Sequence, residues 1–155
     1  MLNSKVMALK WRFKDDHIIN RLKLEIHRVE LDLIEIMAYV GDEAVKEAKL
    51  LKKKDGGFDD VSGNLRSSIG YTILRDGEVV KEGFSGNPEG IDAAIKVLQN
   101  VPRIAGLQLI LVAGMDYASY LESKGFNVIT AQGDMAVVDL ESMFRKYVAK
   151  KIIKI

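Results

Sequence analysis

Residues 58–83 read FDDVSGNLRSSIGYTILRDGEVVKEG, and this stretch decides the fold. Two runs that contain β-branched residues, Ser68–Arg75 and Glu78–Gly83, flank the pair Asp76-Gly77. Asp-Gly is a strong signal for a two-residue hairpin turn, because both turn positions need a positive φ. The stretch therefore predicts two antiparallel strands joined by a tight turn.

A long amphipathic helix precedes this hairpin, because apolar residues recur there by threes and fours and so share one helical face. We expect it to run from about Asp16 to Lys54, with Asp15 or Asp16 as its cap. The pair Gly56-Gly57 is expected to end it, and Gly41 leaves its continuity open. The apolar face comprises Ile18, Leu22, Ile26, Val29, Leu33, Ile36, Val40, Ala44, Ala48 and Leu51.

The same helix carries a second apolar stripe, roughly opposite the first at about 100° per residue. A helix that is apolar on two sides is buried inside its own domain or packed against a second partner. Because a chain of 155 residues can hardly cover both sides, we expect a subunit interface, with packing inside the chain as the alternative. The interface candidates are Leu24, Leu31, Ile34 and Val45.

Further elements follow the hairpin. Asn87-Pro88 opens a helix that stops near Asn100, with the asparagine as cap and the proline at the first helical position. Leu107–Ala113 is the third strand, and we expect it at the centre of the sheet because its apolar run does not alternate. Asp116 is placed to cap a short helix over Tyr117–Lys124.

The end of the chain predicts a short last strand over Phe126–Thr130 and a final helix from about Gly133. The order is α-β-β-α-β-α-(β)-α, so we expect an α+β fold with a small, mainly antiparallel sheet of three to four strands covered by helices. One domain, residues 1–155, is expected to hold the long helix at about 16–54, a strand–helix body at about 58–131 and the C-terminal helix at about 133–153.

Composition excludes several classes of function. The chain has 155 residues, 23 Lys plus Arg against 22 Asp plus Glu, and no Cys. Without Cys there are no disulfides, no thiolate catalysis and no Cys-based zinc or iron–sulfur sites. The net charge of +1 gives no global attraction toward nucleic acid or an anionic membrane. No apolar run reaches the roughly 20 residues of a membrane span, so we expect a soluble intracellular domain without a signal peptide.

No pairing of nucleophile and base is recognisable, so we expect neither an enzyme nor a metal or cofactor site. His17 and His27 lie on the first helix and project about 80° apart, so they cannot jointly bind one metal without partners from elsewhere. Of the carboxylate pairs Asp15-Asp16 and Asp59-Asp60, the second lies in a Gly-rich loop and is expected to be solvated. The loop Asp55–Asp60 lacks the ligand spacing of an EF-hand.

Two other functions stay open. The turn from Gly114 to Tyr117 joins a strand to a helix N-terminus and can in principle receive an anion, although no G-x-G-x-x-G or Walker lysine follows. A small cytosolic α+β enzyme or ligand-binding domain that uses this turn is the alternative function. A DNA-binding accessory protein is the third hypothesis, carried by basic residues at two helix ends, although helix-end charges also have a structural role. These residues are Lys52, Lys53, Lys54, Arg145, Lys146, Lys150, Lys151 and Lys154.

Two segments together carry a family resemblance. Residues 61–70 read VSGNLRSSIG after the long helix, and residues 112–122 read VAGMDYASYLE from the third strand into the short helix. In order and spacing they resemble the small neck proteins of long-tailed bacteriophages and prophages, the tail-completion or tail-component family. That family typically shows T/S-G-x-L-R-x-S-I and, later, Y-A-x-Y/F-x-E-x-G. The matching positions are Ser62, Gly63, Leu65, Arg66, Ser68 and Ile69, then Tyr117, Ala118, Tyr120 and Glu122.

The sequence departs from the family pattern in two places. Lys124-Gly125 sets the glycine one position late, and the helix from Pro88 to Asn100 is longer than in compact members. The resemblance implies a virion structural subunit of the head–tail connector, assembling as a ring of about six copies. It further implies contacts with adjacent connector and tail-terminator proteins, DNA as passing channel content, no membrane partner, and residence in the host cytoplasm before assembly.

Structural roles compete with functional ones at the motif positions. Leu65 and Ile69 are expected in the core, and Arg66 is expected to pair with a nearby carboxylate. Tyr117 and Tyr120 are three residues apart on one helical face, so we expect them to pack over the sheet, with a role in partner contacts as the alternative.

Overall fold

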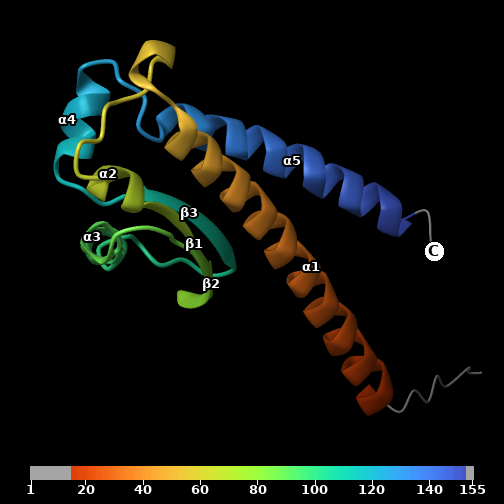
Figure 1. Ribbon diagram of the computed structural model, residues 1–155. Helices are drawn as coiled ribbons and strands as arrows, with labels where there is room; N and C mark the ends of the chain where they lie inside the picture. Colours follow the sequence, from red (N-terminus) through yellow and green to blue (C-terminus); the bar gives the residue numbers. More distant parts are fainter. Residues whose placement is uncertain (1–14, 153–155) are drawn as a thin grey trace, which may run out of the picture. The chain divides into compact units, whose positions relative to one another are not determined.

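The computed structural model describes residues 15–152 (Figure 1). The chain divides into two units, one up to Asp32 and one from Leu33 onward. The α+β class is confirmed, since a long N-terminal helix, a three-stranded antiparallel sheet and further helices follow the predicted order. The elements are α1 (Asp15–Leu50), the 3-10 turn η1 (Lys53–Asp55), α2 (Asn64–Ser67), β1 (Ile69–Arg75), β2 (Glu78–Gly83), α3 (Pro88–Leu98), β3 (Leu107–Ala113), α4 (Tyr117–Ser123) and α5 (Thr130–Ile152).

The sheet has the strand order β2-β1-β3, and both pairs are antiparallel. The predicted hairpin is confirmed, because Asp76 and Gly77 join β1 to β2 with φ values of 53° and 85°. The expectation that the third strand lies at the centre is wrong, because β1 is paired on both sides and β3 is an edge strand. An unbroken apolar run predicts that both faces of a strand are covered. It does not predict that the strand is hydrogen-bonded to a neighbour on both edges.

From residue 33 onward, α1 covers one face of the sheet. Its buried side chains share the main core cluster with Ile69, Tyr71 and Ile73, the alternate residues of β1. The helix is unbroken at Gly41, where a Cβ would lie 2.8 Å from Cγ of Tyr71. The glycine therefore lets the tyrosine ring lie directly on the helix and does not break it.

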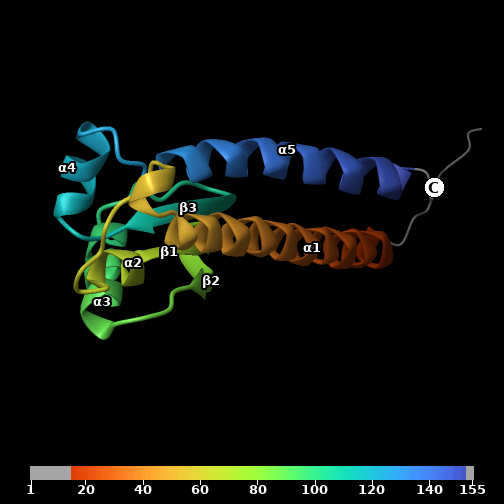
Figure 2. The ribbon, with the colours of Figure 1, turned by 45° about the horizontal axis from the view of Figure 1, so that its top comes forward.

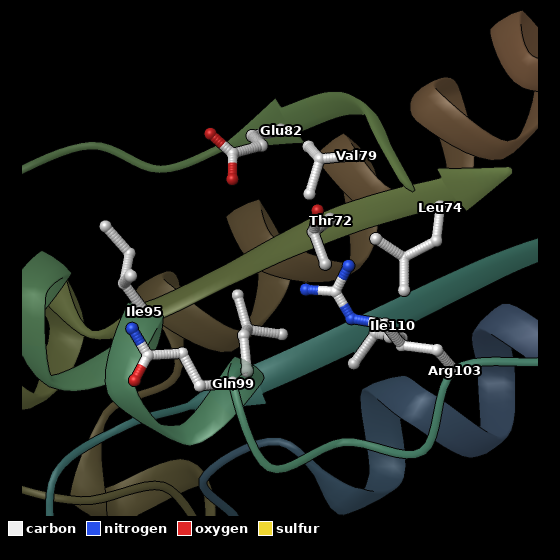
Figure 3. Close-up of a pocket in the computed structure, with 9 residues that line it drawn as sticks. Thr72, Leu74, Val79, Glu82, Ile95, Gln99, Arg103 and Ile110 are labelled. Atoms are coloured by element: carbon white, nitrogen blue, oxygen red, sulfur yellow. The ribbon is translucent and has the colours of Figure 1, made fainter. Parts of the chain in front are cut away.

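The opposite face of the sheet is covered by α3, toward which Thr72 and Leu74 of β1 point (Figure 3). α5 packs beside α1 and β3 in a second, smaller cluster built on Val40, Ala44 and Ala136. The start of α5 lies at the same end of this unit as α4 and η1 (Figure 2). The body of the chain is thus a three-layer arrangement with a thin sheet in the middle.

The end of α1 differs from the prediction. The helix stops at Leu50, before Lys54, and Gly56 closes η1 with a φ of 85° instead of closing α1. The helix begins at Asp15, whose side chain, expected as a cap, lies outside the described part of the chain. The short helix α2 is not in the prediction; it begins after Gly63, which has a φ of 76°.

The strand expected over Phe126–Thr130 is wrong. The backbone N–H groups of Val128, Ile129 and Thr130 bind the Glu122 carboxylate, so they are capping groups of a helix and not part of a strand ladder. α5 accordingly begins at Thr130, ahead of the expected start near Gly133.

The two side-chain caps expected inside the body do not form. Asn87 opens α3 in an extended conformation before Pro88, as predicted, but its amide donates to the Ser62 carbonyl and to Oδ1 of Asn64 at 3.2 and 3.1 Å. Asp116 is itself helical, with φ −53° and ψ −34°, and its side chain makes no cap bond. A cap residue needs an extended backbone for its side chain to reach the first free N–H groups.

Candidate functional site

Arg66 holds the C-terminal end of α1. Its guanidinium donates hydrogen bonds to the backbone carbonyls of Lys49, Leu51 and Phe58, the last two at 2.9 and 3.0 Å, and lies 4.7 Å from the Phe58 ring centroid. Carbonyls at a helix end carry partial negative charge and lack helical partners, so a cation there is both a cap and a counter-charge. We expected Arg66 to pair with a nearby carboxylate; Asp60 accepts its backbone N–H at 2.7 Å, whereas the guanidinium donates to the three carbonyls.

Ser68 ties the start of β1 to the turn after β3. Its buried hydroxyl donates to the Leu65 carbonyl at 2.8 Å and accepts the N–H groups of Gly114 and Met115 at 3.1 and 3.3 Å. Leu65 is fully buried, as predicted, and Gly63 supplies the left-handed residue before it. These three motif positions therefore have structural roles.

Glu122 caps α5 from another helix. One carboxylate oxygen accepts the N–H groups of Val128, Ile129 and Thr130 at 3.0, 2.8 and 3.1 Å. Burial alone would raise the pKa of Glu122, but the hydrogen bonds from these backbone groups outweigh it, and the net effect is a lowered pKa. A negative charge at a helix N-terminus is also favoured by the helix dipole.

The expectation that the two motif tyrosines pack over the sheet is wrong. Tyr117 is 38% and Tyr120 61% exposed, whereas Ala118 between them is buried. α4 packs on the core through Ala118 and Leu121, which places both tyrosines on the outer side. The ammonium of Lys124 lies 5.5 Å from the Tyr120 ring centroid. Tyr117 and Tyr120 are therefore available for contacts with a partner.

The two sequence segments around Arg66 and Glu122 converge on one junction. Arg66 closes α1, Glu122 opens α5, and the N–H of Asn127 donates to the Gly56 carbonyl at 2.8 Å, which links the segment after α1 to the segment before α5. The prediction missed Asn127, and the expectation that Asp60 is solvated is wrong, because its carboxylate accepts the backbone N–H groups of Gly63 and Arg66. Both are Asx residues shortly before a helix, and that position is the signal that could have revealed them as caps. Asn127 accepts the Ala131 N–H at 3.1 Å, and Asp60 accepts the Gly63 N–H at 3.0 Å.

The interface stripe predicted on α1 divides into two parts. Leu24 and Leu31 are 60% and 48% exposed, which leaves them available for an interface. Ile34 and Val45, expected at the same interface, belong instead to the main core cluster, because the sheet already covers them. For Ile34 and Val45 the alternative, packing inside the chain, therefore holds.

The turn considered for a small ligand has few free groups. The N–H groups of Gly114 and Met115 are already bound to Ser68, and a Cβ at Gly114 would lie 2.2 Å from the Ala94 backbone nitrogen. An open hollow beside it is lined by carboxylates of Glu89 and Asp116 as well as by Lys96. Neither the donors nor the charges of this turn favour an anion.

A pocket of about 110 Å³ lies between the sheet and α3 (Figure 3). Its walls are mostly apolar, with Leu74, Val79 and Ile110 from the strands, and the Arg103 guanidinium lies among them. That guanidinium donates to the Gly77 carbonyl beside the hairpin turn, so it already has a structural partner. Sites for drug-sized ligands usually measure about 300–1,000 Å³, so this space suits at most a very small molecule.

Candidate metal ligands do not cluster in the described part of the chain, and two of the basic residues lie beside other side chains, Lys53 beside Asp59 and Lys151 beside Tyr147. Among residues 15–152, no group of three or more His, Asp or Glu side chains could hold a metal ion. His27 lies 3.9 Å from Glu30, one turn away on α1. Lys53 pairs with Asp59 at 3.3 Å, and Lys154 lies outside the described residues. None of the described helices combines the length and the hydropathy of a membrane span.

Two other titratable groups have shifted pKa values. Burial raises the pKa of Tyr71 to about 12, and the hydrogen bond and negative charge of Asp42 add to this. Burial lowers the pKa of Lys49, whose ammonium donates to the carbonyl and hydroxyl oxygens of Ser85 at 2.9 and 3.0 Å. Both groups fasten α1 to the sheet side of the body, Tyr71 through Asp42 and Lys49 through Ser85.

Comparison with known proteins gave no match: neither family models nor characterised proteins nor solved structures resemble this chain closely enough to name a relative.

Proposed function

We propose that the chain is a structural subunit of a phage head–tail connector, a tail-completion or head–tail joining protein that assembles as a ring around the DNA channel. The main support is the place of the two motifs through which the sequence resembles that family. Arg66, Ser68 and Glu122 lie at one junction and fasten the ends of α1, β1 and α5. Residues that hold a fold together are the ones that proteins with the same fold are expected to have in common.

Two exposed apolar surfaces would supply the contacts of the ring. One is the α1 segment up to Asp32, and the other is the pair Tyr117 and Tyr120 on α4. Ring assembly joins one face of a subunit to a different face of the next, and apolar or aromatic patches mark such faces. The exposed aliphatic residues of the α1 segment are Ile18, Ile19, Leu22, Leu24, Ile26 and Leu31.

The nearly neutral net charge of the chain fits DNA that passes through the channel of the ring without being bound tightly. Tight binding to duplex DNA requires many Lys and Arg contacts to phosphates, and here 23 basic residues are offset by 22 acidic ones. In the family that the sequence resembles, DNA likewise passes through the channel and is not recognised by its base sequence. The proposed subunit therefore works through contacts with other proteins and not through a grip on DNA.

Electron microscopy of the purified chain, together with native mass spectrometry, tests the proposal. We expect rings with a central hole that become rarer in Leu24→Asp, with the circular dichroism spectrum unchanged. Leu24→Met keeps an apolar side chain at the same position and is the matched control, which should assemble as the unchanged chain does. Antibody labelling of tailed particles should place the chain at the neck. This second experiment also covers the case in which subunits form a ring only when neighbouring proteins hold them.

Two results would favour the other functions. Reproducible thermal stabilisation by one nucleotide, acyl compound or phosphate ester would favour a ligand site at the turn after β3. Salt-sensitive binding to duplex DNA at modest protein concentration would favour the accessory DNA-binding protein. Labelling absent from the neck, in particles known to contain the chain, would overturn the proposal.

A further inference from the structure

The helix α5 has a second row of small and apolar residues on the side that faces away from the body. Its inner side packs on the body through Ala136, Leu140 and Met143. At about 100° per residue, the second row lies on the opposite side of the helix. All of its members are exposed, Met135 at 53% and Val138 at 66%. We call it the outer row; it consists of Ala131, Met135, Val138, Ser142, Arg145 and Ala149.

The spacing of the outer row is that of a seam between two helices. Its members follow one another in alternating steps of four and three residues, which is the heptad repeat of helices that pack side by side. Ala131, Ser142 and Ala149 are small, so a second helix can approach α5 closely along the row. β3 lies on the inner side of α5 in both views of the chain, so it leaves the outer row open (Figures 1 and 2).

Charged side chains flank the outer row on both sides. Asp139 and Lys146 lie along one flank, and Glu141 lies along the other, next to Arg145 of the row itself. All four are exposed, and within residues 15–152 none of them forms an ion pair. Charges beside a helix seam determine which helix pairs with it and in which direction, so these four indicate the occupant.

We propose that α5 of one copy packs antiparallel on α5 of a second copy through the outer row, with Ser142 opposite Arg145 of the second copy. In an antiparallel pair each flank faces the same flank of the other helix. Asp139 then faces Lys146 of the second copy, and Glu141 faces Arg145 of the second copy. The two-fold axis repeats each of these contacts, so four pairs of opposite charge surround the seam.

The side chains of the seam fit the same register. Val138 packs on Ala149 of the second copy, and the small Ser142 leaves room for the long side chain opposite it. Residues 135–152 of the two copies overlap over roughly 27 Å of helix, at about 1.5 Å per residue. Because α5 binds its own body through its inner side, the two bodies lie on opposite sides of the helix pair.

Other arrangements of the same two helices bring like charges together. Sliding the second copy by one heptad in one direction sets Asp139 against Asp139 and Glu141 against Glu141, and sliding it in the other direction sets Lys146 against Lys146. A parallel pair places the two Arg145 guanidinium groups opposite each other in the seam. Like charges that face each other across an interface oppose its formation. The charges therefore favour a second copy in one direction and one register.

This two-fold contact does not rest on the proposed ring. It uses the same face of both copies, whereas a ring joins two different faces. The surfaces proposed for the ring are the α1 segment up to Asp32 and the two exposed tyrosines of α4, and none of these residues belongs to the outer row. Leu24→Asp, which should disrupt the ring, is therefore expected to leave the two-fold species intact.

Reversal of exposed charges tests the pairing, its direction and its register. Asp139→Lys leaves lysine at both positions 139 and 146, and Lys146→Asp leaves aspartate at both, so each variant repels itself across the seam. We expect sedimentation equilibrium to show a two-fold species for the unchanged chain. The dissociation constant should rise about tenfold or more in each variant, because two attractive pairs become repulsive. Lys96→Asp, the same change at an exposed position of α3, is the matched control and should leave the dissociation constant unchanged.

An equimolar mixture of Asp139→Lys and Lys146→Asp gives the sharpest result. Each lysine of one variant then faces an aspartate of the other, so the mixture should associate although neither variant does so alone. Native mass spectrometry identifies the mixed species, because the two variants differ in mass, and circular dichroism checks that both are folded. A monomer of the unchanged chain at all concentrations, a dimer that neither reversal weakens, or a mixture that does not associate would overturn the proposal.

Discussion

One helix behaves in two ways along its length. In the part of α1 up to Asp32 the large aliphatic residues are exposed, with Ile26 at 60%, whereas in the part from Leu33 onward Val40 is 3% exposed and Ala48 is fully buried. Both parts show the same three-and-four spacing of apolar residues. Periodicity therefore predicts that a segment is helical and amphipathic, but it does not predict what covers the apolar face.

Residue size separates the two parts. Small residues recur from Ala38 through Gly41 and Ala44 to Ala48, and Gly41 is the position on which the Tyr71 ring lies. The segment 16–32 has no Ala and no Gly. Small side chains let a sheet or a helix approach closely, so their run marks where α1 belongs to the body of the chain. The predictions below test this division, beginning with the largest expected effect.

A charge on each side of the boundary should have opposite consequences. Ile34→Asp would bury a carboxylate in the main core cluster, and we expect it to lower the free energy of unfolding by about 4 kcal/mol or more. Leu31→Asp, three residues earlier and about half exposed, should change it by no more than about 0.5 kcal/mol. Urea unfolding followed by circular dichroism measures both. Unfolding of Leu31→Asp would show that the first part of α1 also has a covered face.

The capped end of α1 should be the next most sensitive place. Arg66→Ala removes the donors from three carbonyls, and we expect a loss of about 2–3 kcal/mol of unfolding free energy. Arg66→Lys keeps the positive charge near the helix end but cannot reach all three acceptors, so its loss should be smaller. Equal losses in the two variants would show that hydrogen-bond geometry matters and charge does not; no loss in either would contradict the capping role.

Glycine substitutions in two helices should have opposite signs. Gly41→Ala gains helix propensity but sets a methyl group within 3.0 Å of the Tyr71 ring, so we expect a net loss of about 1 kcal/mol. Gly133→Ala in α5 is the matched control, because a Cβ there meets nothing within 4 Å, and it should stabilise by about 0.5–1 kcal/mol. Thermal unfolding of both variants is the measurement. A stabilising Gly41→Ala would mean that the ring moves aside easily.

The hairpin and the junction show why some of this architecture could be predicted and some could not. Asp76 and Gly77 determine their turn through their own backbone preferences, so the hairpin is readable locally. The partners of Arg66 and Glu122 are brought to them by the folded chain, and neither spacing nor composition identifies those partners. The sequence of β3 did not predict its edge position, because a central strand and an edge strand whose faces are both covered show the same apolar run.

The cap of α5 should give the smallest effect and a characteristic dependence on pH. α5 packs on Val40 and Ala44, so the cap supports the buried part of α1 indirectly. Because the folded pKa of Glu122 is lowered, its charge stabilises the fold above the unfolded pKa near 4.5, and this contribution is lost as pH falls through the folded pKa. Glu122→Gln should therefore be about 0.5 kcal/mol less stable at pH 7 and nearly equal to the unchanged chain in acid. Urea unfolding at both pH values measures the difference, and Glu25→Gln, at an exposed position, is the control. A difference that persists in acid would mean that the amide distorts the cap itself and that the charge contributes little.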